Sequence, residues 1–224
     1  MSYAELHALS NFSFLRGASH PRELVAQAQA LGYAALALTD ECSVAGVVRA
    51  HTAAKECGLP FIVGSEFRLA EGLRCVLLAT HRQGYGQLSR LITAGRRAAP
   101  KGGYHLTLAD FERPLDGCVL LWLPSTPGAA TERVEHARFL RERFEGRLWL
   151  AVELLGGGND RQLLRERVAF ANRHGLPSLA SGDVHLHVPA RRALQDTLTA
   201  IRLRTPLQAA GHALYPNGRS ESVV

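Results

Sequence analysis

The stretch LGYAALALTDECSVAGVVRAHTAAKECGLPFIVGSEF (31–67) decides the fold class, because it contains two apolar runs with a helix-like segment between them. The runs YAALALTD (33–40) and PFIVGSEF (60–67) are rich in strand-favouring residues. The segment 44–57 reads as a helix, and a glycine follows it directly. A strand, a helix and a second strand in this order predict a parallel β-α-β unit.

The same alternation continues along the whole chain of 224 residues. Strand-like apolar runs are expected at 4–9, 33–40, 60–67, 74–80, 117–124, 148–155 and 178–185. Helices are expected at 21–31, 44–57, 85–98, 131–144, 161–174 and 190–202. Several runs are apolar almost throughout, which is typical of parallel strands covered on both faces. The pattern predicts an α/β fold with a mainly parallel sheet, either an open doubly wound sheet or a barrel.

Polar residues gather where the apolar runs end. They are His7, Asp40, Glu66, Asp183 and His185. In barrels built of β-α units the functional site lies at the carboxyl ends of the strands, so this distribution favours the barrel.

Two of these positions have a local interpretation. Asp183 and His185 are two residues apart, so on a strand their side chains would share one face and suit two ligands of one metal. Asp40 lies just before a predicted helix, and we expect it to cap that helix rather than to bind a metal.

Composition bounds the remaining function classes. The chain is 46% hydrophobic and 21% charged, as in ordinary globular proteins, and no apolar run is long enough to cross a bilayer. We therefore expect no membrane partner and a cytoplasmic location. The four cysteines form no C-x-x-C pair, and no Gly-rich phosphate loop or nucleophile elbow is present.

The charge balance is basic, at +6 with a pI near 9.5. This excess fits a polyanionic partner such as DNA, and it fits equally a solvated surface in an arginine-rich composition. The basic, Gly-rich segment 95–108 supplies the candidate nucleic-acid contacts Arg96, Arg97 and Lys101.

Four longer motifs occur in a characteristic order. They are ELHALSNFSFLRGAS (5–19), the stretch 31–67 already quoted, LLATHRQGYGQLSRLIT (77–93) and SGDVHLHVPARRALQDTLTAIRL (181–203). Together they resemble the polymerase and histidinol phosphatase (PHP) domain that opens bacterial C-family DNA polymerases, and within that family the error-prone branch. The resemblance implies a single-domain, distorted (β/α)7 barrel over residues 1–210, which agrees with the seven runs. We expect 211–224 to be a linker or the start of a following polymerase region.

The resemblance also implies a metal centre of up to three ions, of which this chain keeps only a part. The matching ligand positions are His7, Glu66, Asp183 and His185, with Asp40 and Glu41 as possible substitute ligands. The degenerate positions are Leu9, Arg16, Arg74 and Leu155. We therefore expect no catalytic residue in this chain, and either no cofactor or one weakly bound divalent ion, Zn or Mn.

The chemistry of the replacements suggests what fills the site. Leucine has no lone pair, and arginine has only donors and a permanent charge. Our hypothesis is that Arg16 or Arg74 replaces the metal charge by pairing with Glu66, Asp183 or Asp40, because buried carboxylates need a cation. The domain would then be an inactive scaffold. The alternative is an active metal-dependent phosphoesterase or 3′–5′ exonuclease with altered ligands.

By the same resemblance, the parent protein is expected to be a damage-induced, error-prone DNA polymerase that uses Mg for translesion synthesis. Its expected partners are DNA, the remaining polymerase domains of the same chain, the sliding clamp and other translesion accessory proteins.

Overall fold

The computed structural model describes residues 2–124 and 130–214. Its seven strands are β1 (Ala4–Ala8), β2 (Ala35–Leu38), β3 (Phe61–Arg68), β4 (Arg74–Ala79), β5 (Cys118–Trp122), β6 (Leu148–Glu153) and β7 (Ser178–Ser181). The longer helices are α1 (Pro21–Ala30), α2 (Val47–Cys57), α3 (Arg82–Arg97), α4 (Ala130–Arg143), α5 (Asp160–Arg173) and α6 (Arg192–Leu203). A short α7 (Leu207–Ala210) and three 3-10 turns complete the described chain. Every predicted strand and helix is present, with bounds that differ by a few residues.

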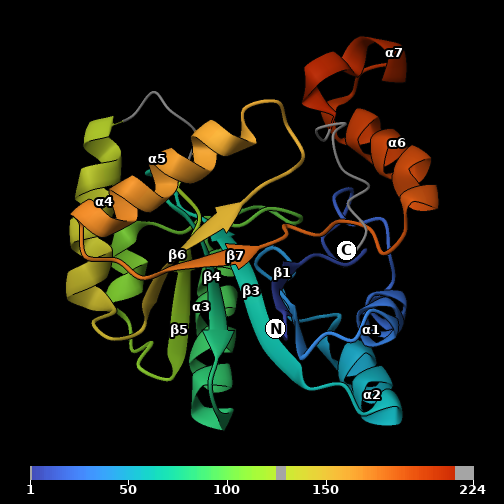
Figure 1. Cartoon of the computed structure of the whole chain (residues 1–224). Coiled ribbons are helices and arrows are strands. Elements are labelled where there is room, and N and C mark those ends of the chain that lie inside the picture. The colour runs from blue at the N-terminus through green and yellow to red at the C-terminus, as the bar shows by residue number, and fades with distance from the viewer. Residues whose placement is uncertain (1, 125–129, 215–224) are drawn as a thin grey trace.

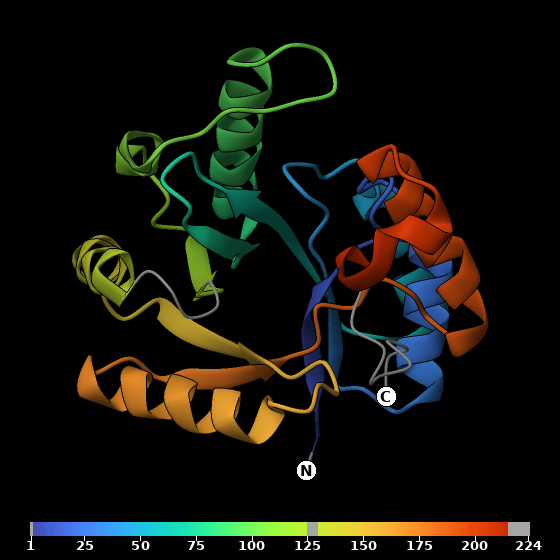
Figure 2. The ribbon, with the colours of Figure 1, turned by 90° about the horizontal axis from the view of Figure 1, so that it is seen from above.

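The strands form one sheet in the order β1 to β7. The chain segment after β7 returns to β1 through a parallel bridge between Ala8 and Val184, and Leu9 N donates to Val184 O at 2.8 Å. The sheet therefore closes on itself almost completely, and the barrel, not the open sheet, is confirmed. Figure 2 shows the strands as a curved wall with the helices outside it.

The sheet is mainly parallel, as expected, but β4 runs against both of its neighbours. A link of only five residues, 69–73, joins β3 to β4, and so short a link permits only an antiparallel return. As a consequence, the first residue of β4 lies at the end of the barrel where the other strands finish. The sequence pattern did not reveal this reversal, because a short apolar run looks the same in either direction.

Two hydrophobic layers hold the barrel together. Outside the wall, Leu77, Leu120 and Trp122 belong to the largest buried cluster, which also takes in residues of α3 and α4. Inside it, Val76 and Ala151 belong to a smaller cluster. Because side chains alternate along a strand, the inner face fixes which residues at the strand ends can point into the barrel mouth.

The helix α6 lies over that mouth. Its residues Gln195, Thr199 and Arg202 line the same pocket as Asp183 and His185. Figure 1 shows α6 and α7 at the C-terminal end of the described chain, set apart from the helices that cover the outside of the barrel. Within residues 2–124 and 130–214, each helix is too short or too polar to cross a bilayer.

Candidate functional site: an ion-pair cluster at the barrel mouth

The strand ends bring the candidate residues together at the barrel mouth. Arg74 begins β4 on the same face as Val76, and Glu66 lies directly across from Val76 on β3, so both point inward. His7 lies within an irregularity in the pairing of β1 with β2, between Glu5 and Ala8. Irregularities of this kind re-aim a strand residue. Because β4 runs in the reverse direction, its first residue, Arg74, lies beside the polar residues at the ends of the parallel strands.

Glu66 is the centre of the cluster. It is fully buried and accepts hydrogen bonds from Arg74 Nε at 2.8 Å and Arg16 Nη2 at 3.0 Å, while His7 Nε2 lies 3.3 Å away. Arg16 also donates to Glu41. A buried carboxylate is stable only with partners of this kind. The expected pairing of Arg16 and Arg74 with a carboxylate is therefore present at Glu66, and the replacement of a metal charge by this pairing stays a prediction.

A second carboxylate group lies beside Glu66. Arg74 Nη2 donates to Asp183 Oδ2 at 3.1 Å, and its Nη1 lies 3.7 Å from Glu153 Oε2. His7 Nδ1 lies 2.6 Å from Glu153 Oε1 and 3.5 Å from Asp183 Oδ1. One guanidinium thus joins three carboxylates that come from β3, β6 and the segment after β7.

These contacts set the protonation states. Burial raises the pKa of the Glu66 carboxyl, but Arg74, Arg16 and His7 outweigh burial and hold it well below its usual 4.5. Burial also raises the pKa of the Asp183 carboxyl, and Arg74, His7 and His185 bring it well below 3.8. Burial lowers the pKa of His7, but Asp183 and Glu153 raise it to about 10. His7 is therefore a third cation at neutral pH and donates from both ring nitrogens.

His185 differs from His7 in its protonation state. Burial lowers its pKa, and Asp183 only partly opposes this, so the imidazole is neutral. Its Nε2 lies 3.2 Å from Asp183 Oδ1, and its Nδ1 lies 3.3 Å from Gln195 Nε2 on α6. Neutral His185 therefore donates to Asp183 and accepts from Gln195.

Asp183 and His185 do converge, but not on a strand. The strand β7 ends at Ser181, and Asp183 has φ +48°, in the left-handed region. The expectation of one strand face was wrong, because the chain turns there. Gly182 makes this turn possible, since a Cβ at that position would lie 2.3 Å from Glu5 Oε2.

Asp40 is buried and does not cap a helix. Its carboxylate accepts from Ser10 N at 2.8 Å, Ser10 Oγ at 2.7 Å and Ser13 Oγ at 2.7 Å. The next helix begins at Val47 with Gly46 as its N-cap. The capping prediction was therefore wrong, because the loop after β1 supplies the donors that Asp40 accepts from. Asp40 thus holds in place the loop that carries Arg16.

Glu41 lies at the mouth with two donors. It accepts from Arg16, and Tyr104 Oη donates to its Oε1 at 2.9 Å. Arg96 binds the same turn, since it donates to the backbone oxygens of Glu41 and Cys42, each at 3.0 Å. The side chains of Arg97 and Lys101 are exposed to solvent.

Glu153 is the site residue that sequence reasoning missed. It ends β6 on the inner face, with Ala151 two residues before it. The signal was present, because Glu153 lies near the end of an apolar run, as Glu66 does. In this run the site position was assigned to Leu155, which lies two residues later and also lines the pocket.

The metal-binding capacity of the cluster follows from these distances. One ligand atom each from His7, Glu153 and Asp183 lies within 4.8 Å of the others, so this group could hold one ion. Two ligands on one zinc lie about 3 Å apart or more, whereas His7 and Glu153 approach to 2.6 Å. Protonated His7 has no free lone pair, and Arg74 occupies the carboxylates from the other side. The described residues thus offer a His7, Glu153 and Asp183 group that could hold an ion, and Arg74 already pairs with Asp183 in that group.

The opening above the cluster is a pocket of about 420 Å³. Its lining includes Arg16, Arg68, Arg74, Leu155 and Arg202. Leu9, which was also expected from the sequence to replace a ligand, is fully buried in the core. Arg16, Arg74 and Leu155 thus face the pocket, whereas Leu9 does not line it.

Comparison with solved structures supports the fold assignment. A putative metal-dependent phosphoesterase from Bifidobacterium adolescentis superposes with a TM-score of 0.59 at 16% identity, covering 82% of this chain and 88% of the other. An amidohydrolase from Chromobacterium violaceum gives a TM-score of 0.55 at 19% identity, over 83% and 88%. At these identities the likeness shows a shared fold and no more.

Sequence comparison identifies the family. The PHP domain model matches residues 5–124, and the chain belongs to the PHP domain family. It is 57% identical over 217 residues to the error-prone DNA polymerase of Methylococcus capsulatus and 55% identical over 221 residues to that of Dechloromonas aromatica. Each match covers 96% of this chain and 20% or 21% of the relative. The chain thus spans about a fifth of the length of these curated relatives.

Proposed function

We propose that this chain is the PHP domain of an error-prone DNA polymerase and that its ion-pair cluster replaces a metal centre as the scaffold of the barrel mouth. The observation that carries this proposal is the position of Arg74. Its guanidinium lies among Glu66, Asp183 and Glu153 and satisfies carboxylates that a metal ion would otherwise have to satisfy.

The charges of the cluster support the scaffold role. Three cations, Arg16, Arg74 and protonated His7, face four carboxylates, those of Glu41, Glu66, Glu153 and Asp183. The cluster ties the loop after β1 to β3, β4, β6 and the segment after β7. Such a network fixes the relative positions of strand ends, but it offers neither a nucleophile nor an open coordination position for hydrolysis.

Hydrolysis of bis(p-nitrophenyl) phosphate tests the proposal. We expect the purified chain, supplied with Mn or Zn, to give no turnover above that of its Asp183→Ala variant. Robust turnover that Asp183→Ala or His7→Ala abolishes would overturn the scaffold role.

The second candidate function is a metal-dependent phosphoesterase or 3′–5′ exonuclease with one ion. The compact His7, Glu153 and Asp183 group favours it. This function requires Arg74 to leave Asp183 and His7 to bind the ion in place of a proton, so activity would rise with pH. The same hydrolysis assay, repeated at neutral and at alkaline pH, distinguishes the two candidates.

At the level of the parent protein, the relatives named error-prone DNA polymerase support a role in DNA synthesis past damaged templates. In that proposal Mg serves polymerase residues outside this chain. The partners are the remaining polymerase domains, DNA, the sliding clamp and translesion accessory proteins, and Arg96, Arg97 and Lys101 stay candidate DNA contacts.

A further inference from the structure

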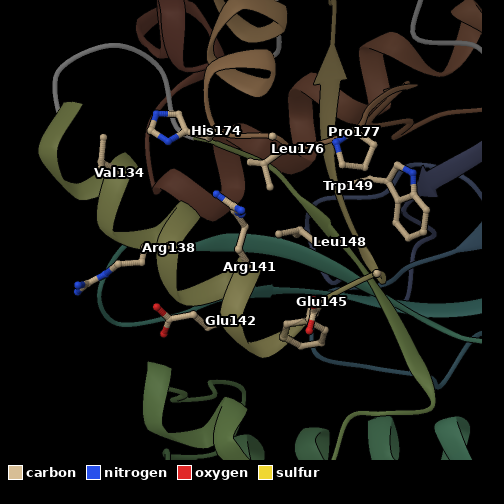
Figure 3. Close-up of a pocket in the computed structure, with 13 residues that line it drawn as sticks. Val134, Arg138, Arg141, Glu142, Glu145, Leu148, Trp149, His174, Leu176 and Pro177 are labelled. Atoms are coloured by element: carbon tan, nitrogen blue, oxygen red, sulfur yellow. The ribbon is translucent and has the colours of Figure 1, made fainter.

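A groove separates α4 from α5 on the outside of the barrel, away from the ion-pair cluster. One pocket of about 830 Å³ lies among the end of α4, the start of β6 and the turn after α5. A second, of about 390 Å³, lies between Arg133 of α4 and the stretch from Glu166 to Arg173 of α5. Figure 3 shows the larger pocket, with Arg138 and Arg141 on one side and His174 on another.

Arginine dominates the polar lining of this groove. Arg133, Arg138, Arg141, Arg167 and Arg173 line the two pockets. The acidic side chains in the same lining are Glu142, Glu145 and Glu166, so the groove has an excess of two positive charges.

Most of these arginines have no protein partner. Within residues 2–124 and 130–214, the guanidinium groups of Arg138, Arg141 and Arg173 make no ion pair or hydrogen bond. Arg167, in contrast, donates to the backbone oxygen of Pro124 at 2.6 Å. The Nε of Arg133 is buried and has no acceptor. By contrast, Arg147 close by donates to the backbone oxygens of Leu115 and Cys118. Arg138, Arg141 and Arg173, unlike Arg147 and Arg167, therefore do not serve to hold the fold together.

Two of the arginines also crowd each other. Burial lowers the pKa of Arg167, and the nearby charge of Arg133 lowers it further. Glu166 and Glu153 oppose this shift but do not outweigh it, so an anion beside the two guanidinium groups would be favoured.

We propose that the groove between α4 and α5 binds the phosphate backbone of DNA. This inference rests on the proposed role in a DNA polymerase. Arg133 and Arg141 are eight residues apart on α4, a rise of about 12 Å. That distance matches three or four nucleotides at about 3.4 Å per nucleotide along one strand. Guanidinium groups spaced in this way can neutralise phosphates that lie three or four nucleotides apart on one strand.

The test measures the affinity of the chain for a fluorescein-labelled 20-mer, single-stranded and duplex, by fluorescence anisotropy at several salt concentrations. The test variant carries Arg138→Gln, Arg141→Gln and Arg173→Gln, three exposed side chains whose loss leaves the fold intact. The matched control carries Lys55→Gln, Arg82→Gln and Arg90→Gln, exposed on α2 and α3 and outside the groove. Circular dichroism confirms that both variants are folded.

We expect the groove variant to bind at least about 10-fold more weakly, and its salt slope to fall by about two to three, since each lost phosphate contact removes about 0.7–0.9. The control should stay within about twofold of the parent chain. Equal losses in the two variants, or no DNA binding at low salt, would overturn the proposal. So would equal groove-dependent binding of poly-glutamate, which would assign the groove to an acidic protein. None of these outcomes bears on the hydrolysis assay, so the scaffold role and the DNA groove fail separately.

Discussion

The Arg74 Nε group donates a hydrogen bond of 2.8 Å to Oε1 of Glu66, a carboxylate with no exposed surface. The other end of the same guanidinium reaches Asp183. An arginine at the start of a reversed strand thus holds two carboxylates from different parts of the barrel. Five experiments test this arrangement and the loop that carries Arg16.

Removing the guanidinium should destabilise the protein strongly. Arg74→Met keeps the apolar stem but leaves Glu66 and Asp183 without their main cation. We expect the free energy of unfolding, measured by urea denaturation at pH 7, to fall by about 3 kcal/mol. The control is Arg68→Met, whose side chain is 58% exposed and lies 3.6 Å from Glu66. It should cost less than about 1 kcal/mol. Equal losses would show that Arg74 contributes no more than a surface charge.

Acid should weaken the same contacts. The folded-state pKa values of Glu66 and Asp183 lie well below 4.5 and 3.8, so their contribution to stability is complete above those values and is lost as the pH falls. We expect the urea midpoint to decline as pH falls from 5 towards 3. Arg74→Met should decline less steeply, because its carboxylates are nearer their ordinary pKa values. Parallel curves for the two proteins would contradict this explanation.

Asp40 should matter through its hydrogen bonds alone. Asp40→Ala leaves the buried donors of Ser10 and Ser13 without an acceptor, and we expect a loss of about 3 kcal/mol. As a comparison, Asp110→Ala removes a partly exposed acceptor for Thr107 and should cost about 1 kcal/mol. A loss at Asp40 no greater than that at Asp110 would remove its assigned role in holding the loop that carries Arg16.

The seven strands were predictable because each is a short apolar run bounded by turn residues, and that pattern survives without tertiary information. The reversal of β4 was not predictable, although it is the reason that Arg74 lies in the site. The left-handed backbone of Asp183 was equally unpredictable, since an aspartate in the sequence does not announce a positive φ.

The candidate site was predictable to the extent that it follows strand ends. His7, Glu66, Asp183 and His185 come together as expected, and Glu153 joins them by the same rule. Asp40 was misjudged because its partners, Ser10 and Ser13, are about 30 residues away in sequence. Contacts of that kind depend on the path of the loop, and this path cannot be predicted from the spacing of residues in the sequence.

Substituting metal-ligating residues at Leu9, Arg16 and Arg74 should create a metal site. Leu9→His, Arg16→Glu and Arg74→His together replace an apolar group and two cations by groups with lone pairs. We expect this variant, and not Leu9→His alone, to bind zinc and to melt at a higher temperature when zinc is added, because metal binding stabilises the folded state. A variant that folds but takes up no more zinc than the parent chain would show that more than these three positions prevents binding.

Elemental analysis of the purified parent chain, after exposure to Zn and Mn and removal of free ions, tests the central claim most directly. If Arg16, Arg74 and protonated His7 serve as the cations of the barrel mouth, the chain will retain well under one ion per molecule. Two or three retained ions per chain, lost in Asp183→Ala, would contradict that claim.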